Sequence, residues 1–375
     1  MSNTASYEIN LITLRHKHHA QASGYDRVAE YLDGRIIPPV TEWRVPTRAA
    51  ARLLRPMIRR SGSLWYHRAS LVRELRVARQ WLRGSPQLFH FLYGENSFRY
   101  AGLLKRIFPG NAIVCTYHTP PARFREVVTD RRHLSDIDAL VVLSSAVVDF
   151  FGDFVGRDRV FYIPRGVDTE WFTPRPAQER PRDRFDVLCI GSHLRDFECL
   201  AGAAGLLGRT DPRIRFKVVT FPRHHHHFAG LDNVELLANI SDAELLELYR
   251  SCHTLALPLL DATANNVIVE ALACGLPVIS TDLMGVRDYT TPECALLTSK
   301  GDAAALAQAV RALSAAPERR AAMAEAARRR ALEFRLEAIA GQLRELYGQV
   351  MERVARSAVH PAAVRVRNSH GRGRS

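Results

Sequence analysis

The sequence predicts an α/β protein with two Rossmann-like domains that face each other across a cleft. Short apolar runs of strand length alternate with helical patterns through both halves of the chain, as in βαβ units. The chain of 375 residues exceeds one ordinary core, so we expect about two domains. A stretch dense in proline and charge follows residue 173, which places the domain boundary near residues 170–184.

The composition is that of a soluble globular protein, with 47% hydrophobic and 24% charged residues. The N-terminal stretch has no apolar core long enough for export, and no apolar run reaches about 18 residues. We therefore expect a cytoplasmic protein. The six cysteines form no Cys-x-x-Cys pair and are expected to be reduced and buried, and no metal site is expected.

Positive charge is concentrated in one part of the first half. The net charge is +13, and residues 48–83 hold ten arginines and a single acid, Glu74. No helix-turn-helix, zinc-finger or RNP pattern accompanies this block, so we expect no nucleic-acid partner. Two interpretations stay open: a solvated basic face, or attraction to an anionic membrane surface, because apolar residues interleave with the arginines as in interfacial helices.

In the first half we expect a strand at residues 7–14, a polar loop, and a helix that starts at Gly24 and runs through residue 32. Gly24 would let the backbone approach a ligand, with Arg27 facing it; a turn glycine with a surface arginine is the alternative. Two basic helices follow, then strands at 88–93, 112–117 and 138–144 and a helix at 97–107. Glu95 and Asn96 come just beyond one strand, and His118 directly after the next.

In the second half a strand at 185–190 is followed by a polar segment that contains Arg195. Arg215 and Lys217 alternate with apolar residues on the next strand and share its polar face. The four histidines at 224–227 are expected to form a loop without metal, because consecutive residues cannot all reach one ion. Ser241 and Glu244 form a capping box that starts a helix through residue 250.

Residues 255–289 form the most informative unit. Their pattern predicts a buried strand at 255–260, a loop of small and amide residues at 261–266, a helix at 267–273 and a second strand from 278. The loop lies at the carboxyl end of a strand, where open α/β sheets bind ligands, and its backbone N–H groups at the helix start suit a phosphate. Glu270, on that helix, is placed to reach the hydroxyls of a bound ribose.

This unit resembles the C-terminal signature of retaining glycosyltransferases of family 4, which have the GT-B fold. The resemblance lies in Glu270-Ala-Leu-Ala-Cys-Gly-Leu-Pro-Val-Ile-Ser-Thr-Asp282. The segment Ile163-Pro-Arg-Gly-Val-Asp168, followed by Phe172 and Pro174, is similar to the family segment IPNGVDxxxFxP. His118 after its strand is similar to the family histidine that contacts the donor sugar, with a core histidine as the alternative.

The chain departs from the family pattern in two places. Ala262 stands where the family has a first Glu that contacts hydroxyls of the donor sugar, and Thr263-Ala264-Asn265-Asn266 replaces the family's Gly-Phe-Gly. Ser192 stands where the family has the Arg of a Gly-Arg pair, and the usual Lys is missing. Arg195, with His193 as a helper, is therefore left to neutralise the donor diphosphate.

The resemblance implies an acceptor-binding first domain at residues 1–172 and a nucleotide-sugar-binding second domain at 173–335. A terminal helix at 336–356 would cross back to the first domain, and a basic disordered tail would occupy 357–375. The implied catalytic residues are His118 and Arg195. The implied donor-binding residues are Gly24, Gly191, Ser192, His193, Asp261, Thr263, Asn265, Asn266, Val267 and Glu270, and the implied acceptor-binding residues are Arg27, Glu95 and Asn96.

We therefore expect a sugar to move from a nucleoside-diphosphate donor to an acceptor hydroxyl with retained configuration, without metal or cofactor. Surface polysaccharide, glycolipid or secondary-metabolite biosynthesis would be the setting. The expected partners are a nucleotide sugar and a lipid-linked or soluble acceptor, with the inner face of an anionic membrane if residues 48–83 bind it. The alternatives are a nucleotide-sugar epimerase of the same shape and a non-catalytic binding module, because Ala262 and Ser192 both remove family side chains.

Overall fold

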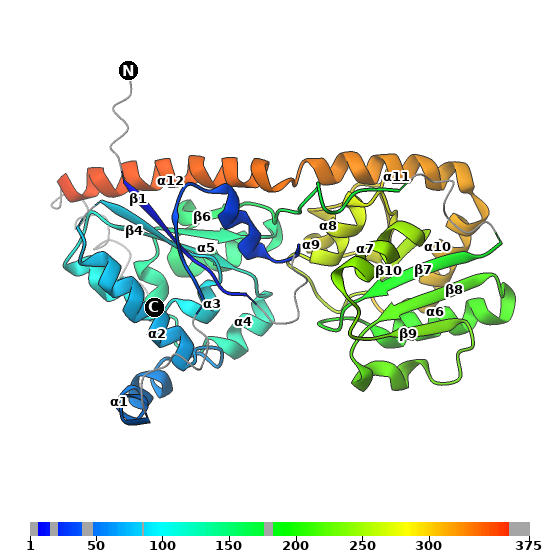
Figure 1. Cartoon of the computed structure of the whole chain (residues 1–375), viewed down its shortest axis with the longest axis horizontal. Helices are drawn as coiled ribbons and strands as arrows, with labels where there is room; N and C mark the ends of the chain where they lie inside the picture. Colours follow the sequence, from blue (N-terminus) through cyan, green and yellow to red (C-terminus); the bar gives the residue numbers. More distant parts are fainter. Residues whose placement is uncertain (1–6, 16–21, 40–47, 85, 176–182, 360–375) are drawn as a thin grey trace, which may run out of the picture.

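The computed structural model describes residues 7–15, 22–39, 48–84, 86–175 and 183–359. Within them the chain forms two α/β domains that lie end to end (Figure 1). The helices α11 (Pro317–Leu332) and α12 (Leu336–Val359) run along one edge of the pair. The predicted α/β fold with two Rossmann-like domains is confirmed, and the tail predicted after the terminal helix lies, from residue 360, outside the described residues.

The first sheet has six parallel strands in the order β2-β1-β3-β4-β5-β6. The strands are β1 (Glu8–Ile12), β2 (Arg35–Ile37), β3 (Gln87–Phe91), β4 (Ala112–Tyr117), β5 (Ala139–Val142) and β6 (Val160–Tyr162). The middle strands β3, β4 and β5 are buried throughout, as expected where helices cover both faces of a parallel sheet. The direction of winding reverses between β1 and β3, so their carboxyl ends border a crevice.

The helices of this domain confirm the two predicted basic helices. They are α1 (Arg48–Arg59), α2 (Arg68–Trp81), α3 (Gly94–Ser97), α4 (Pro121–Val127) and α5 (Val148–Val155), with short 3-10 helices η1 (Tyr25–Tyr31), η3 (Ala101–Arg106), η4 (Arg132–Asp136), η5 (Ser145–Val147) and η6 (Arg157–Arg159). The helix predicted from Gly24 is therefore the 3-10 helix η1.

The continuous helix predicted at residues 97–107 is wrong, because the chain forms α3, a break and then η3. The cause is Glu74, which is only 3% exposed. Its Oε1 accepts hydrogen bonds from the backbone N–H groups of residues 99, 100 and 101 at 2.7, 2.7 and 2.9 Å. These N–H groups point to the α2 carboxylate, so they are not available to continue a helix from α3.

The second sheet also has six parallel strands, in the order β9-β8-β7-β10-β11-β12. They are β7 (Phe185–Ile190), β8 (Ile214–Val219), β9 (Val234–Leu237), β10 (Thr254–Leu257), β11 (Val278–Thr281) and β12 (Ala295–Thr298). Numbered along the chain this is the 3-2-1-4-5-6 order of a dinucleotide-binding Rossmann sheet. Its switch point, where ligands bind in such sheets, lies between β7 and β10.

The helices of the second domain are α6 (Phe197–Thr210), α7 (Asp242–Ser251), α8 (Asn266–Ala273), α9 (Met284–Arg287), α10 (Ala303–Ala315) and α11. The capping box predicted at Ser241 is confirmed at the start of α7. The four histidines predicted as a loop lie instead in a 3-10 helix, η8 (Pro222–Phe228), which begins with a proline at a position that favours helical φ.

Several contacts hold the domains together, among them those of α12 and of Asp288. Helix α12 returns to the first domain, where Ile339, Leu343 and Tyr347 are buried in its core, and the Tyr347 hydroxyl lies 2.6 Å from His90 Nδ1. Asp288, after α9, accepts hydrogen bonds from Ser144 and Ser145 at the end of β5 at 2.6–2.8 Å. The carboxyl ends of both sheets therefore border the space between the domains.

Candidate active site

The loops after β7 and β10 pair with each other at the switch point of the second sheet. Leu260 N–H donates to the Leu194 carbonyl at 2.9 Å, and Asp196 N–H donates to the Pro258 carbonyl at 3.0 Å. The loop after β7 contains Gly191, Ser192, His193 and Arg195, and the loop after β10 contains residues 261–265, so the structure brings the two predicted donor-binding groups together.

Arg195 is the cation at this switch point. Its Nε donates to the Ile190 carbonyl at 2.8 Å, Nη1 to the His193 carbonyl at 2.9 Å, and Nη2 lies 3.5 Å from Asn265 Oδ1. No carboxylate in the described part of the chain forms an ion pair with it. Burial lowers the pKa of Arg195 below its ordinary value. The guanidinium is held in place by neutral oxygens, and its charge is left for an anion.

Asn265 connects Arg195 to the start of α8. It is the N-cap residue of this helix, and its Oδ1 accepts a hydrogen bond from Val267 N–H at 3.1 Å. Asn266 is the first helical residue and is half-buried, whereas Val267 is buried. The first backbone N–H groups of α8 and the Arg195 guanidinium therefore meet at one place, which suits a phosphate group.

Ser192 and His193 do not converge on this point with their side chains. Ser192 Oγ lies 2.8 Å from Thr220 Oγ1 and accepts a hydrogen bond from Phe221 N–H at 3.4 Å, so it joins the loops after β7 and β8. The His193 side chain is exposed, and its carbonyl holds Arg195. In this structure both residues support the loop that carries the cation.

The loop at residues 261–264 spans from Arg195 to the first domain. Asp261 Oδ1 accepts a hydrogen bond from Ala262 N–H at 2.8 Å, and the buried Thr263 hydroxyl donates to the His118 carbonyl. The Ala262 carbonyl packs on Gly285 in α9 so closely that a Cβ at Gly285 would lie 2.1 Å from it. Only glycine permits this approach, so α9 sets the position of the loop.

A substitution at Gly285 should therefore move the 261–264 loop without touching a substrate. We expect Gly285→Ala to lower turnover by about 10-fold or more, because displacements near 1 Å in positioning groups can cost factors of this size or larger. Steady-state kinetics with a nucleotide-sugar donor measures the effect. Gly348→Ala, in α12 where a Cβ meets nothing within 4 Å, is the matched control. Unchanged kinetics in a folded Gly285→Ala protein would show that the position of this loop does not matter.

Glu270 lies on α8 between the two domains. It is 4% exposed, Oε1 accepts a hydrogen bond from Ser23 Oγ of the first domain at 2.5 Å, and Oε2 accepts one from Tyr249 OH at 2.8 Å. Burial raises the pKa of this carboxyl, and these two hydrogen bonds oppose the rise. The carboxylate is thus held by two hydroxyl donors, the kind of group that ribose hydroxyls would replace.

His118 lies at the end of β4, as expected, in an aromatic setting. Its ring stacks on Tyr93 with centroids 4.3 Å apart and meets Tyr25 edge-on at 4.9 Å. Nε2 lies 2.7 Å from the Leu92 carbonyl. Because a carbonyl only accepts, Nε2 carries the proton, and in the neutral imidazole Nδ1 is the acceptor atom.

Glu95 holds the backbone around His118. Its Oε1 accepts hydrogen bonds from His118 N–H at 2.9 Å and from Thr119 Oγ1 at 2.8 Å, while the buried Oε2 has no hydrogen-bond partner among the described residues. Burial raises the pKa of Glu95 to about 7, so this carboxyl keeps its proton in weakly acidic solution. Asn96 follows it, half-buried, in α3.

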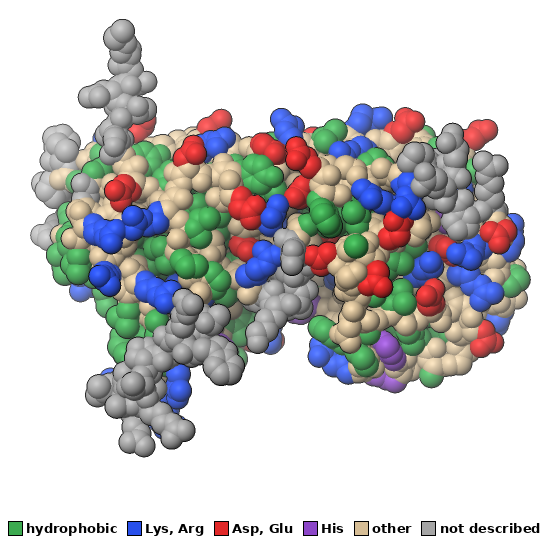
Figure 2. Space-filling model, in the orientation of Figure 1, with side chains coloured by type: hydrophobic (Ala, Val, Ile, Leu, Met, Phe, Trp, Pro, Cys, Tyr) green, Lys and Arg blue, Asp and Glu red, His purple; other side chains and the backbone are tan. Residues whose placement is uncertain are grey.

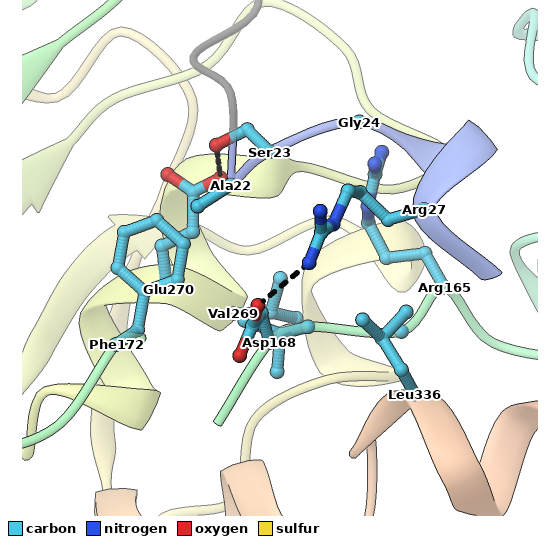
Figure 3. A pocket seen from close by; sticks show the side chains of 12 residues that line it. Ala22, Ser23, Gly24, Arg27, Arg165, Asp168, Phe172, Val269, Glu270 and Leu336 are labelled. Atoms are coloured by element: carbon cyan, nitrogen blue, oxygen red, sulfur yellow. Dashed lines mark hydrogen bonds and ion pairs between the residues drawn. The ribbon is translucent and has the colours of Figure 1, made fainter. Parts of the chain in front are cut away.

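A pocket between the domains brings together residues from four parts of the chain (Figure 3). Its lining includes Gly24, Arg27, Arg165, Asp168 and Glu270. Gly24 has φ of 115°, a conformation that side chains rarely allow, and Arg27 donates to Asp168 at 3.0 Å and forms an ion pair with Glu30. Sequence reasoning did not single out Arg165, Asp168, Ser23 or Tyr249. Only Arg165 offered a signal, since it replaces the Asn of the family segment.

Two features are absent from the residues that the structure describes. No group of three or more His, Cys, Asp or Glu side chains there is arranged to hold a metal ion. None of the helices in the same part of the chain combines the length and apolar character needed to cross a membrane.

Two protein-family models match this chain, one for each domain. The model described as Glycosyltransferase Family 4 matches residues 10–171, and the model described as Glycosyl transferases group 1 matches residues 184–316. Among curated proteins, the chain is 27% identical over 308 residues to an MMP alpha-(1->4)-mannosyltransferase of Mycolicibacterium hassiacum, covering 73% of each. It is 29% identical to a D-inositol 3-phosphate glycosyltransferase of Stackebrandtia nassauensis, covering 63% of this chain and 59% of that protein.

Solved structures show the same fold at low identity. A sucrose-phosphate synthase from Thermosynechococcus elongatus superimposes with a TM-score of 0.68 at 20% identity, over 92% of this chain and 100% of that one. The Anabaena HepE protein in complex with UDP-glucose superimposes with a TM-score of 0.63 at 16% identity, over 92% and 100%.

The two Rossmann-like domains, together with the two family models, define a glycosyltransferase of GT-B fold. The chain belongs to glycosyltransferase family 4, with both domains of the family present.

Proposed function

We propose that this protein transfers a sugar from a nucleoside-diphosphate sugar to an acceptor hydroxyl, with retained configuration and without a metal ion or cofactor. The observation that carries the proposal is Arg195, a cation without a carboxylate partner in the described part of the chain, beside the N-terminus of α8. The departing diphosphate gains negative charge as the sugar leaves, and fixed donors at this place stabilise it. The two curated relatives, a mannosyltransferase and an inositol-phosphate glycosyltransferase, support a sugar-transfer reaction.

Further residues of the site are assigned to the other parts of a bound donor: its ribose, its phosphates and its sugar. Glu270 binds the ribose hydroxyls in place of the hydroxyls of Ser23 and Tyr249. Asn265, Asn266 and Val267 present the backbone of α8 to the phosphates. His118 presents Nδ1 to a hydroxyl of the transferred sugar, and Thr263 fixes the His118 backbone across the cleft.

The acceptor binds on the side of the first domain. Glu95 is buried and accepts a hydrogen bond from the His118 backbone N–H, so it acts by positioning that histidine. Asn96 is more accessible than Glu95 and is therefore the residue of the two that contacts the acceptor. Arg27 is paired with Asp168 and holds the η1 helix against the segment that links the domains.

A screen of nucleotide sugars tests the proposal. The protein is incubated with UDP-, GDP-, ADP- and dTDP-sugars, each with and without a mixture of candidate acceptors, and products are followed by mass spectrometry. Sugar transfer with release of a nucleoside diphosphate is expected. A donor converted to its isomer without an acceptor would identify an epimerase instead, and binding without any conversion would identify a non-catalytic module.

Glu270 provides a prediction for donor binding. Glu270→Ala is expected to weaken nucleotide binding by roughly 1.5–3 kcal/mol for each hydrogen bond lost, because a charged acceptor of hydroxyl hydrogen bonds disappears. Isothermal titration calorimetry measures the change. Glu352→Ala, an exposed site on α12, serves as the control. Equal nucleotide affinity in the Glu270 variant and the wild-type protein would rule out the ribose assignment.

Peripheral membrane binding at the inner face is the second part of the proposal. Helix α1 projects from the first domain (Figure 1), and in Figure 2 Lys and Arg side chains are interspersed with hydrophobic ones on this domain. Arg55, Arg59 and Arg60 are exposed, and Met57 is 37% and Leu64 65% exposed. Each cation near an anionic bilayer contributes about 1 kcal/mol, so a few on one side hold a protein at the surface at low salt.

Sedimentation with vesicles measures this binding. We expect pelleting with anionic but not neutral lipid, reversed by added salt, and loss of pelleting when Arg55, Arg59 and Arg60 are all replaced by Gln. A folded, active protein that stays in the supernatant with anionic vesicles at low salt would contradict membrane binding and favour a soluble acceptor.

A further inference from the structure

The pocket between the domains contains two arginines, Arg27 and Arg165, and Arg165 has not yet been assigned a role. Arg165 is 7% exposed and lines this pocket with Gly24, Arg27 and Glu270. Its backbone N–H donates to Tyr289 OH at 2.9 Å, which fixes the chain at this point. Within the described residues its guanidinium forms no hydrogen bond and no ion pair. In Figure 3 this side chain rises beside Arg27 toward the backbone of Gly24.

The carboxylates of the pocket are already engaged. Asp168 accepts a hydrogen bond from Arg27 at 3.0 Å, and the oxygens of Glu270 accept from Ser23 and Tyr249 at 2.5 and 2.8 Å. A counter-ion for Arg165 would have to come from one of these groups or from outside the residues that the structure describes. Because a buried charge without a partner is costly, a pocket that keeps one is suited to an incoming anion.

The surroundings of Arg165 indicate which part of a ligand reaches it. The charge of Arg165 acts on Tyr25 and Tyr93, the two rings that pack on His118. Burial raises the pKa of Tyr25 to about 12, and the charge of Arg165 opposes this rise. Glu270 lines the same pocket as Arg165. Burial raises the pKa of Glu270, and the charge of Arg165 opposes this rise. Arg165 therefore lies within electrostatic reach of the proposed sugar site and of the proposed ribose site.

We propose that Arg165 binds an oxyanion of the nucleotide sugar, namely the diphosphate or a carboxylate carried by the transferred sugar. This inference rests on the proposed function, in which Arg195 and the start of α8 bind the diphosphate, His118 the sugar and Glu270 the ribose. The second domain lacks the second cation, a lysine, that the family pattern would place after β7, and Arg165 supplies a positive charge from the opposite side of the cleft. Arg165 stands where the family segment IPNGVDxxxFxP has Asn, so this chain has a positive charge where that segment has a neutral side chain.

Nucleotide titrations with Arg165→Asn test the inference. The affinities of UDP, GDP, ADP and dTDP and of the matching monophosphates are measured by calorimetry for the wild-type protein and the variant. For the base that binds, kcat/KM is then compared for a neutral hexose donor and a hexuronic-acid donor. Arg213→Asn is the matched control, because Arg213 is exposed and paired with Asp211. Thermal denaturation verifies folding, and Arg165→Gln carries the same test if the Asn variant does not fold.

Each outcome decides the matter. A loss of about 10- to 100-fold in diphosphate affinity, with monophosphate affinity unchanged, supports the proposal and identifies the diphosphate as the anion. Unchanged diphosphate affinity, with a comparable loss of kcat/KM for the hexuronic-acid donor alone, supports it and identifies a sugar carboxylate. Affinities and kcat/KM values within about twofold of wild type for every ligand overturn it. A wild-type protein that binds no nucleotide would instead overturn the proposed function on which it rests.

Discussion

Replacement of Arg195 by methionine is expected to lower kcat by about 10²- to 10³-fold, the usual cost of one missing electrostatic donor at a developing negative charge. Methionine keeps much of the apolar stem and removes the guanidinium. The structure gives the reason for so large an effect. The guanidinium is held by the carbonyls of Ile190 and His193 and near Asn265, and within the described residues it has no carboxylate to neutralise it.

Single-turnover and steady-state kinetics with the donor found in the screen measure this loss. Arg215→Met is the matched control, because Arg215 is an exposed arginine on β8 whose side chain, within the described residues, hydrogen-bonds only the Asp232 carbonyl. Since Arg195 also joins the two loops at the switch point, a thermal unfolding curve must show that the variant is folded. A folded Arg195→Met protein with wild-type kcat would contradict the assignment of Arg195 to the leaving group.

The second large effect is expected at His118. His118→Ala should lower kcat by about 10- to 100-fold, because it removes an acceptor for a sugar hydroxyl and leaves the Leu92 carbonyl without its donor. Nucleoside-diphosphate affinity should stay close to wild type, since in the proposed function the histidine contacts the sugar and not the nucleotide.

Calorimetry with the nucleoside diphosphate and kinetics with the intact donor separate these two quantities. His226→Ala, at an exposed histidine of η8, is the control. Full turnover in the His118 variant would show that the residue is structural. An equal loss of nucleotide affinity and turnover would place it at the nucleotide instead.

Much of this architecture could be predicted from the sequence because it depends on local patterns. The buried strands β4 and β7 match their predicted bounds, and β11 begins at the predicted residue 278, because apolar runs between polar turns predict strands directly. The loop and helix at residues 261–273 followed from the change of periodicity. The cluster of Arg195 with the start of α8 followed from the rule that parallel strands end at one edge of a sheet.

The features that the sequence did not reveal depend on long-range contacts. Glu74 breaks the expected helix from a distance of about two dozen residues, through a carboxylate that no local pattern reveals. Ser23 reaches Glu270 across 247 positions, and Arg27 reaches Asp168 across 141. The partners of Glu270 could therefore not be named before the domains were placed side by side.

The most direct test of sugar transfer with retention is to follow the reaction by ¹H NMR with the donor and acceptor found in the screen. The anomeric proton of the sugar is observed in the donor and in the first product formed. The proposed function predicts a product with the same anomeric configuration as the donor, with one nucleoside diphosphate released for each sugar transferred. A product of opposite configuration would contradict retention, and the absence of any enzyme-dependent release of nucleoside diphosphate would contradict sugar transfer itself.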